Sequence, residues 1–529
     1  MTRTITTALA SLCLLIGTAC TAQDSEGDRP LRQAQDKPNI IFFFTDDQAY
    51  DTLASYGNPN VKTHNIDRLG SQGVIFDRHY DTTAICMASR ANVMTGLYEY
   101  KSGTNFMHGP MSKDIWSRSY PMLLQGAGYR TGFGGKFGFA VVEDPTRGGK
   151  DNNWDHLPDE DFDFWVGGLG QTSYDTVKNK YLARFADKYP HSSRAYGAAG
   201  QEFIKDSVAA GEKFCLSIYF KAPHRPVQPD PMFDDVYKDT VFRKLPNYGR
   251  PAGEHLAPQS RMGRQYGRFT VWNYHTDEKY HQSLRKYNQQ IYGVDYAVGM
   301  IVEELERQGV SDNTVIIFSS DNGFFNGSHG MGSKVLPYEE GARVPLIIYD
   351  PRSKSKGNGR RVASVTGNVD VAATIMDLAG VELPENIDGK SLLPLVHDTT
   401  DSVRDSLAVI NVWGTQGTTS MTIVTDTHKY VYWPYGEEFE PAEELFDLEN
   451  DPFELKNVIS DSAYAATLKT IRTEYKAQLA KWKSEAVPYN DYQQFGTILD
   501  PDVAWEKKKD LFPKGFATGM RYYTGEIAN

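Results

Sequence analysis

The chain has 529 residues, a formal net charge of −12 at pH 7 and 40% hydrophobic side chains. This length allows a large buried core and exceeds the usual size of one domain, so we expect two packed units. The negative net charge argues against nucleic acid as a partner, although it leaves room for a local basic pocket.

Residues 1–22 have the pattern of a secretory signal peptide. Arg3 precedes an apolar stretch over residues 8–16, and small side chains follow this stretch. The segment is too short to stay in a membrane as a span. We therefore expect export to the periplasm or the outer membrane, with residues 23–36 as a polar tether.

The cysteines add two expectations. Residues 17–20 (Gly-Thr-Ala-Cys) partly resemble a bacterial lipobox, but the usual Leu three residues before Cys20 is absent, so a lipid anchor at Cys20 stays an open alternative. Beyond the tether only Cys86 and Cys215 remain, so we expect no disulfide framework despite the export. Cys215 lies in a strand-like apolar run and is predicted to be a core residue.

Two short apolar runs each end in a pair of side chains with oxygen donors. Residues 39–44 lead to Asp46 and Asp47, and the run that begins at residue 314 leads to Asp321 and Asn322. Apolar runs without alternation are typical of strands that are buried on both faces of a parallel sheet. Ligands of such sheets bind beyond the carboxyl ends of the strands. Four oxygen donors there suit a hard cation, and we expect calcium, because the sequence has no Cys/His cluster with zinc spacing.

The segments after these runs continue an alternation of helices and strands. Residues 287–308 have apolar side chains at helical spacing, residues 344–349 are predicted to form a strand, and residues 370–378 a helix. We therefore predict an α/β fold with a large mixed, mostly parallel sheet that is flanked by helices.

From about residue 401 the pattern changes. Residues 406–413 and 418–433 are predicted to form strands of a smaller antiparallel sheet, and residues 465–483 a helix. The predicted domains are residues 37–400 and a smaller C-terminal α+β subdomain over residues 401–529. The pattern of residues 489–529 favours no particular structure.

Residues 86–90 (Cys-Met-Ala-Ser-Arg) place an oxidisable side chain, a hydroxyl and a fixed cation close together. The pentapeptide resembles the sulfatase signature C-x-[P/A]-S-R, in which the cysteine is oxidised after translation to formylglycine. The aldehyde hydrates to a geminal diol, and a diol oxygen activated by a metal and a base can attack a sulfate ester. An unmodified cysteine lacks this chemistry.

Other segments match the sulfatase family, within the alkaline phosphatase-like superfamily, in the same order along the chain from about residue 37 to about residue 460. These segments are Asp46-Asp47, Gly134-Gly135-Lys136, Lys221-Ala222-Pro223-His224, Asp321-Asn322-Gly323, His329, Lys334, residues 339–345 (Glu-Glu-Gly-Ala-Arg-Val-Pro), residues 386–392 (Asn-Ile-Asp-Gly-Lys-Ser-Leu), residues 444–448 (Glu-Leu-Phe-Asp-Leu) and Asp451-Pro452. The resemblance makes residues 37–400 the catalytic domain.

The resemblance also implies a role for each site residue. One calcium ion would be held by Asp46, Asp47, Asp321, Asn322 and the modified residue 86. Arg90, Lys136 and Lys334 would hold the aldehyde hydrate and the sulfate oxygens, while His224 would contact the ester oxygen and protonate the leaving group. Asp321 and the metal would help to deprotonate the diol. A maturation enzyme that converts Cys86 to formylglycine is an implied partner.

One position departs from the family pattern. The family commonly has Gly-Lys-Trp-His after the Gly-rich turn, and its histidine takes a proton when the sulfated hydrate returns to the aldehyde. Here Gly138 stands at that position. His79 and His108 are candidates to replace the missing base, while His329 and Arg343 are candidates to line the pocket.

Two insertions bear on the substrate. Residues 151–171 contain Trp154 and Trp165, and residues 248–280 contain several arginines and aromatic side chains, among them Arg264, Arg268 and Trp272. Aromatic faces flanked by Arg can stack on sugar rings and pair with sulfates or carboxylates. We therefore expect a sulfated carbohydrate as substrate, such as an oligosaccharide from a polysaccharide. The alternative is that these aromatic side chains only pack the loops.

Two other functions stay open at the level of the sequence. A phosphomonoester or phosphonate hydrolase of the same superfamily would use the same metal site, although residues 86–90 disfavour it. The second alternative is a catalytically inactive carbohydrate-binding lipoprotein, which the missing histidine would favour.

Overall fold

The computed structural model describes residues 37–146, 155–353 and 359–518. The predicted signal peptide, the tether and Cys20 lie outside the described residues. Residues from Pro38 onward group into one unit. The boundary at residue 400 stays a prediction.

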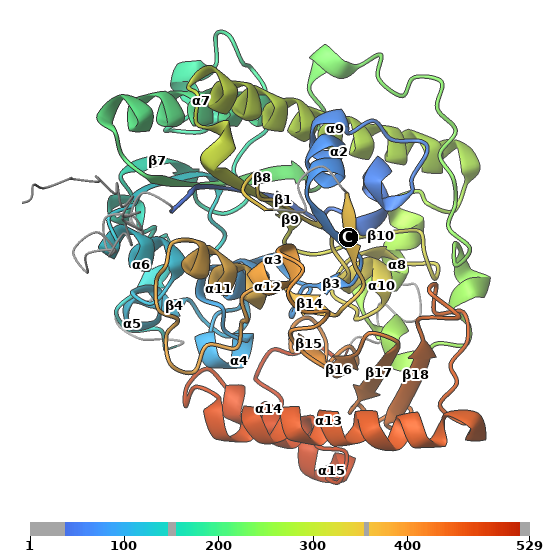
Figure 1. Cartoon of the computed structure of the whole chain (residues 1–529). Coiled ribbons are helices and arrows are strands. Elements are labelled where there is room, and N and C mark those ends of the chain that lie inside the picture. Colours follow the sequence, from blue (N-terminus) through green and yellow to red (C-terminus); the bar gives the residue numbers. More distant parts are fainter. Residues whose placement is uncertain (1–36, 147–154, 354–358, 519–529) are drawn as a thin grey trace, which may run out of the picture. The chain divides into compact units, whose positions relative to one another are not determined.

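An eight-stranded sheet forms the centre of the fold (Figure 1), with the strand order β13-β2-β12-β9-β1-β8-β5-β7. The strands are β1 (Asn39–Asp46), β2 (Val74–Phe76), β5 (Arg130–Lys136), β7 (Phe164–Gly168), β8 (Phe214–Pro223), β9 (Thr314–Ser320), β12 (Leu346–Tyr349) and β13 (Arg360–Val362). Strand β1 pairs in parallel with β8 and β9, and β5 pairs in parallel with β7 and β8. Strand β12 runs antiparallel to both its neighbours. The predicted mixed, mostly parallel sheet is confirmed.

Both faces of this sheet are covered by helices, which explains the uninterrupted apolar run of β1. Ile41 and Phe43 pack in a cluster with side chains of α2 (His64–Gln72), α7 (Ser192–Ala210) and α9 (Asp277–Arg307). Ile40, Phe42 and Phe44 pack on the other face with side chains of α3 (Cys86–Thr95), α6 (Tyr120–Gly126) and α11 (Val369–Leu378). A strand with two buried faces needs no polar positions. Cys215 is buried in β8, as predicted.

The remaining helices and short strand pairs lie between and after the strands of the large sheet along the chain. They are α4 (Glu99–Ser102), α5 (Lys113–Trp116), α8 (Arg264–Val271), α10 (Glu339–Ala342), α12 (Leu393–Val396), and the pairs β3 (His79–Tyr80) with β14 (Thr366–Gly367), β4 (Met111–Ser112) with β6 (Val141–Val142), and β10 (Phe325–Asn326) with β11 (Gly332–Ser333). The predicted helix over residues 287–308 is the C-terminal part of the longer α9. No helix in the described ranges has both the length and the apolar character needed to cross a bilayer.

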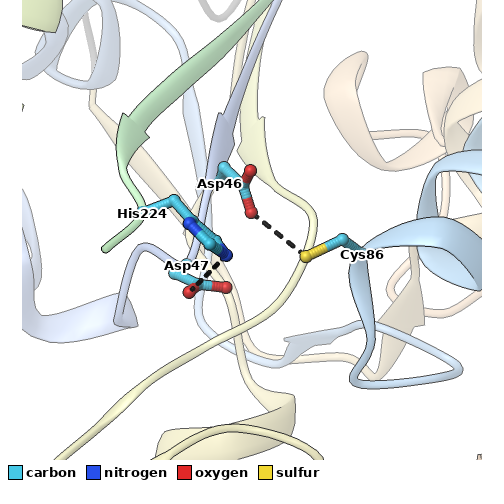
Figure 2. Close-up of side chains that lie close together, drawn as sticks. All are labelled: Asp46, Asp47, Cys86 and His224. Carbon is cyan, nitrogen blue, oxygen red and sulfur yellow. Dashed lines mark hydrogen bonds and ion pairs between the residues drawn. The ribbon is translucent and has the colours of Figure 1, made fainter. Parts of the chain in front are cut away.

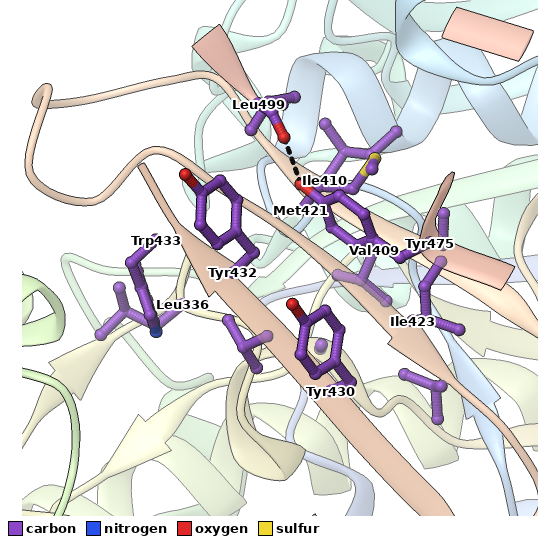
Figure 3. Close-up of a cluster of buried hydrophobic side chains, with 14 of the residues drawn as sticks. Leu336, Val409, Ile410, Met421, Ile423, Tyr430, Tyr432, Trp433, Tyr475 and Leu499 are labelled. Atoms are coloured by element: carbon purple, nitrogen blue, oxygen red, sulfur yellow. Dashed lines mark hydrogen bonds between the residues drawn. The ribbon is translucent and has the colours of Figure 1, made fainter. Parts of the chain in front are cut away.

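A second, four-stranded antiparallel sheet comes next along the chain, as predicted. It contains β15 (Leu407–Asn411), β16 (Ser420–Val424), β17 (His428–Trp433) and β18 (Ala442–Asp447), and it is followed by α13 (Ala465–Glu485), α14 (Tyr492–Ile498) and α15 (Trp505–Lys508). Helix α13 packs on this sheet, and the ring of its Tyr475 stands almost perpendicular to the rings of Tyr430 and Tyr432 (Figure 3). Strand β18 was not predicted from the sequence, because its acidic residues suggest an exposed segment. In the structure Glu444 is buried and accepts a hydrogen bond from Nε1 of Trp433.

Candidate active site

Four central strands deliver polar side chains to one edge of the sheet. Asp46 is the last residue of β1 and Lys136 the last residue of β5, while His224 follows β8 directly and Asp321 follows β9 directly. The four strands are neighbours in the order β9-β1-β8-β5 and are parallel, so their carboxyl ends meet. The predicted convergence of the two acidic pairs is therefore present: the backbone N–H of Asp47 donates to Oδ1 of Asp321 at 3.1 Å.

Helix α3 brings Cys86 to this edge. Cys86 is the first residue of the helix, and its Sγ donates to Oδ1 of Asp46 at 3.2 Å (Figure 2). The Nζ of Lys334 lies 2.5 Å from the same sulfur atom. A helix N-terminus and an ammonium group both favour negative charge, so an oxyanion formed at residue 86 would be stabilised. Burial, with Asp321 and Asp46 adding to it, raises the pKa of the Cys86 thiol well above its usual value, so an unmodified cysteine would be a poor nucleophile here.

Arg90 lies one helical turn after Cys86 and is fully buried. Its Nε and Nη2 contact Oδ2 of Asp321 at 2.9 and 2.8 Å, and its Nη1 donates to the carbonyl oxygen of Lys136 at 2.7 Å. A planar guanidinium fits such a fork of acceptors better than an ammonium group does. Arg90 therefore joins α3 to the ends of β9 and β5.

The two neighbouring aspartates have different partners. The Nζ of Lys136 lies 2.5 Å from Oδ2 of Asp46. Burial opposes the ionisation of Asp46, but Lys136 and the other nearby cationic groups outweigh it and hold the pKa of this carboxyl well below its usual value. Asp47 has a positive φ of 68°, which turns its side chain toward Lys334 and toward Nδ2 of Asn322 at 2.8 Å.

His224 is the histidine of this centre. Its Nδ1 lies 2.5 Å from the carbonyl oxygen of Arg225, so Nδ1 carries a proton and donates it to that carbonyl. Its Nε2 lies 3.7 Å from Oδ2 of Asp47 and faces the cluster (Figure 2). Burial lowers the pKa of His224 to about 4, although Asp46 and Asp47 oppose this shift. Nε2 is thus the nitrogen available for proton exchange with a bound ester.

The donor atoms of this centre fit a metal ion. Ligand atoms of Asp46, Asp47, Cys86 and His224 all lie within 4.8 Å of one another. Asn322 adds a further oxygen: its Oδ1 is buried and has no hydrogen-bond partner in the described part of the chain. A buried carbonyl oxygen without a donor is costly, and a cation would satisfy it. Because carboxylate and amide oxygens dominate this set, it suits a hard cation, and His224 stays available for proton transfer.

The centre opens into a cavity of about 1180 Å³. Asp47, Cys86, His224 and Lys334 belong to its lining. The other lining residues are Ile85, Phe106, Gln171, Arg225, Pro226, Val227, Asp234, Arg264, Arg268, Val271, Trp272, Asn273, Gln282, Ser283, Arg285, Lys286, Gln289, Ser333 and Trp413. A cavity of this size holds a sugar or a short oligosaccharide.

Residues 38–381, which carry every side chain of this centre, match the family described as sulfatase. The chain belongs to the sulfatase family. It is therefore a sulfuric ester hydrolase, and the resemblance seen in the sequence is confirmed. Residues 327–483 also match the region described as N-sulphoglucosamine sulphohydrolase, C-terminal.

Relatives and solved structures agree with this family. The chain is 27% identical to an N-acetylglucosamine-6-O-sulfatase of Bacteroides thetaiotaomicron, over 89% of this chain and 90% of the relative. A solved structure described as a complex with its substrate D-glucosamine-2-N,6-O-disulfate has a TM-score of 0.71 and 24% identity, and covers 85% of this chain and 98% of that one. The phosphonate monoester hydrolase of Agrobacterium radiobacter has a TM-score of 0.68 and 22% identity, and covers 85% and 96%. At these identities the two structures establish a shared fold.

The sulfatase thus brings together the residues predicted for catalysis and metal binding: Asp46, Asp47, Cys86, Arg90, Lys136, His224, Asp321, Asn322 and Lys334. Arg264 and Arg268, predicted for the substrate, line the cavity. Trp154 lies outside the described residues, and Trp165 stacks on Phe133 at 5.0 Å instead of lining the cavity.

The structure does not bring His79 or His108 to the cavity. His79 is buried, with Nδ1 3.0 Å from Oγ1 of Thr366. The two ring nitrogens of His108 face the backbone carbonyls of Val412 and Asn490 at 2.8 and 3.1 Å. Neither histidine is placed to exchange a proton at residue 86.

His329 and Arg343 also lie away from the cavity lining. Nε2 of His329 is 3.8 Å from Oε2 of Glu340, inside a buried cluster with Glu454. Arg343 pairs with Glu339 at 3.3 Å and covers the ring of Tyr50.

Several side chains of the cavity were not predicted from the sequence, among them Arg225 and Trp413. Arg225 follows His224 directly, so its position beside a predicted site residue could have drawn attention to it. Trp413 lies two residues after β15 of the C-terminal sheet, and no local pattern in the sequence connects it with Cys86.

Proposed function

We propose that this sulfatase hydrolyses sulfate esters of a carbohydrate, such as oligosaccharides derived from a sulfated polysaccharide, and that residue 86 acts as formylglycine beside one calcium ion. The observation that carries the proposal is the position of Cys86 at the first turn of α3, between Oδ1 of Asp46 and Nζ of Lys334, on the floor of a sugar-sized cavity.

Calcium would be held by Asp46, Asp47, Asp321, Asn322 and the modified residue 86. When bound, the ion and the hydrated aldehyde supply a hydroxyl nucleophile and a positive charge that stabilises its deprotonated form. Asp321 lies within reach of the same cluster as a proton acceptor, and Arg90 keeps its carboxylate in place.

The cationic side chains are arranged for a sulfate group. Lys136 at the end of β5 and Lys334 after β11 point at the two aspartates, so their ammonium groups flank the place where the sulfate must bind. They would neutralise charge that accumulates on the sulfate oxygens and on the departing oxygen. The Nε2 of His224 faces the same place and would exchange a proton with the leaving sugar hydroxyl.

A carbohydrate substrate is supported by the cavity and by the relatives. The lining combines cationic side chains with Trp272 and Trp413, which suits anionic sugar rings. The Bacteroides relative is described as an N-acetylglucosamine-6-O-sulfatase, and the ligand of the similar solved structure is a disulfated glucosamine. Both observations concern other proteins and guide the choice of substrates to test.

The proposal includes export and maturation. The pattern of residues 1–22 supports export to the periplasm or outer membrane, with Cys20 as a lipidation site to be tested. A formylglycine-generating enzyme would have to act on the Cys86 segment before folding is complete, because Cys86 is 2% exposed in the folded chain.

The experiment uses protein expressed with and without a formylglycine-generating enzyme. Residue 86 is assayed with an aldehyde-reactive hydrazide and by peptide mass spectrometry. Sulfate release from sulfated oligosaccharides is compared with phosphate and phosphonate ester hydrolysis. We expect aldehyde and sulfate release to appear together, and both to be lost in Cys86→Ser and Cys86→Ala.

The matched control is Cys215→Ala, which removes the other described cysteine from the core of β8 and should keep the aldehyde and the activity. Sulfatase activity in protein that contains only unmodified Cys86 would disprove the formylglycine proposal. Faster hydrolysis of a phosphonate ester than of any sulfate ester would favour the phosphonate alternative. A lack of turnover of all esters by aldehyde-containing protein that still binds sulfated sugar would favour the inactive lipoprotein.

A further inference from the structure

The cavity above Cys86 is positively charged in a chain whose net charge is −12. Its lining contains six Arg and Lys side chains but two Asp side chains. Lys334 contacts the sulfur of Cys86 and serves the reacting sulfate. The lining has five further cations, so the cavity offers more positive charge than one monoanionic sulfate ester requires.

Two of these cations share one aromatic side chain. The guanidinium carbon atoms of Arg225 and Arg268 lie 4.6 and 4.4 Å from the ring centre of Trp272. Nη1 of Arg268 also donates to Oγ of Ser333 at 2.7 Å. Arg225 forms no ion pair with a carboxylate of the described chain. A guanidinium that rests on an indole ring loses little further freedom when it binds an anion, so these two side chains are prepared to receive one.

A stack of aromatic rings connects Trp272 to the catalytic centre. Trp272 stacks on Phe324 with an interplanar angle of 8°, and Phe324 stacks on Tyr287 with an angle of 22°. The hydroxyl of Tyr287 donates to the carbonyl oxygen of Asp47 and accepts from the N–H of Ala49. Phe324 and Tyr287 are both buried. The stack therefore fixes the position of Trp272 relative to Asp47.

Each arginine is connected directly to a neighbour of the catalytic centre. Arg225 follows His224, whose Nε2 faces the cluster, and Arg268 bonds to Ser333, which precedes Lys334. Because both arginines and Cys86 line one cavity, an anion held by both arginines would lie in the same cavity as the scissile sulfate. A substituent of the same sugar ring can reach such a position.

We propose that Arg225, Arg268 and Trp272 form a subsite for a second anionic group, a sulfate or a carboxylate, on the sugar that carries the scissile sulfate ester. This inference rests on the proposed carbohydrate sulfatase function. It adds a substrate specificity, because the enzyme would select sugars with two neighbouring anionic groups. The arginines bind the anion in charge-assisted, two-pronged contacts.

The test measures kcat/KM for pairs of sugar sulfates that differ in one substituent. D-glucosamine 2-N,6-O-disulfate and N-acetyl-D-glucosamine 6-O-sulfate form one pair, and regioisomeric disulfated and monosulfated hexoses form the others. We expect the wild type to prefer the dianionic member of at least one pair. Arg225→Gln and Arg268→Gln should each reduce that preference by about 10- to 100-fold, which is the usual effect of losing a hydrogen bond to a charged group.

Two comparison variants distinguish a specific anion subsite from a general effect of the positive charge in the cavity. Arg285→Gln removes a charge from the same cavity at a residue outside the proposed subsite, and should alter both members of a pair alike. Arg118→Gln removes a charge from an exposed pair with Asp114 outside the cavity and should change nothing. Because Arg268 also bonds to Ser333 beside Lys334, Arg225→Gln is the decisive variant, and circular dichroism and thermal unfolding establish its folding.

Equal rates for both members of every pair in the wild type would overturn the inference. An equal loss on both members in Arg225→Gln, or an equal change of preference in Arg285→Gln, would also overturn it. These outcomes differ from a failure of the proposed function, in which the wild type would release sulfate from aryl sulfates but from no sugar.

Discussion

The Cδ of Arg90 lies 2.5 Å from the position that a Cβ atom on Gly138 would occupy, and Gly138 has a φ of 98°. The guanidinium of Arg90 is bonded to Asp321 and to the carbonyl oxygen of Lys136, so Arg90 cannot turn aside. The histidine that is common in sulfatases at this position therefore has no room in this chain. Its absence is a property of the packing around Arg90.

Gly138→Ala should destabilise the protein and reduce its activity. The new methyl group would displace Arg90 and, through it, Asp321. We expect the free energy of unfolding to fall by about 1–3 kcal/mol beyond the cost of a positive φ in alanine. Urea unfolding followed by circular dichroism measures this difference, and sulfate release measures the activity.

The matched control for this variant is Gly128→Ala. Gly128 has a similar φ of 84°, but a Cβ atom there would have no neighbour within 4 Å. Gly128→Ala should therefore lower the free energy of unfolding only by the cost of a positive φ in alanine, and should keep full activity per folded molecule. Equal destabilisation by the two substitutions would show that the side chain of Arg90 can move away from the new methyl group at little cost in free energy.

Asn322→Ala should weaken calcium binding, because it removes the buried Oδ1 that has no partner within the described chain. We expect the calcium dissociation constant to rise by at least about tenfold. Isothermal titration of the metal-free protein gives the constant directly, and the calcium-induced rise in Tm should shrink in parallel. Asn322→Asp keeps an oxygen at this position and should restore binding. Unchanged calcium affinity in Asn322→Ala would remove Asn322 from the ligand set.

His224→Ala should slow the hydrolysis of sugar sulfates more than that of an activated aryl sulfate. A sugar hydroxyl is a poor leaving group and needs a proton as the bond to sulfur breaks, whereas an activated phenolate leaves without one. We expect a loss of about 100-fold or more for the sugar and a much smaller loss for the aryl ester. Parallel losses on both substrates would limit His224 to positioning the ester.

The stability of the protein should decrease with rising pH through Asp295. Burial raises the pKa of this carboxyl from 3.8 to about 7, although bonds from Ile66 and Asn65 oppose the shift. Since the folded state binds the proton more tightly than the unfolded state, the contribution of Asp295 to stability falls as the pH rises between these two values. Asp295→Asn keeps an acceptor for the N–H of Ile66 and should lose less stability than the wild type as the pH rises from 3.8 to about 7. Urea unfolding at several pH values measures both slopes, and identical slopes would contradict the prediction.

Much of the centre could be predicted because it depends on local sequence. The apolar runs before Asp46 and Asp321 indicated buried parallel strands, and parallel strands end at the same edge of a sheet. The spacing between Cys86 and Arg90 is one helical turn, so the motif itself places both side chains on one face of α3. These relations need no knowledge of distant contacts.

The side chains that face the substrate cavity could be predicted only in part from the local sequence. The insertion with Arg264 and Arg268 could be identified by composition, and both arginines line the cavity. Trp165 has the same composition signal but stacks on Phe133. Composition does not distinguish an aromatic side chain that packs a loop from one that faces a ligand, because burial is decided by segments far away in the chain.

The sequence by itself thus determined the chemistry that reaches the edge of the sheet: the acidic strand ends, the oxidisable Cys86 and its cations. Only the tertiary structure decided which histidine and which aromatic side chains join them. His108 is held by the carbonyl oxygens of Val412 and Asn490, and Trp413 enters the cavity from the C-terminal sheet. The physical reason is that strand ends are brought together by the regular geometry of parallel pairing, whereas side chains from loops and a second sheet are placed by contacts that have no period in the sequence.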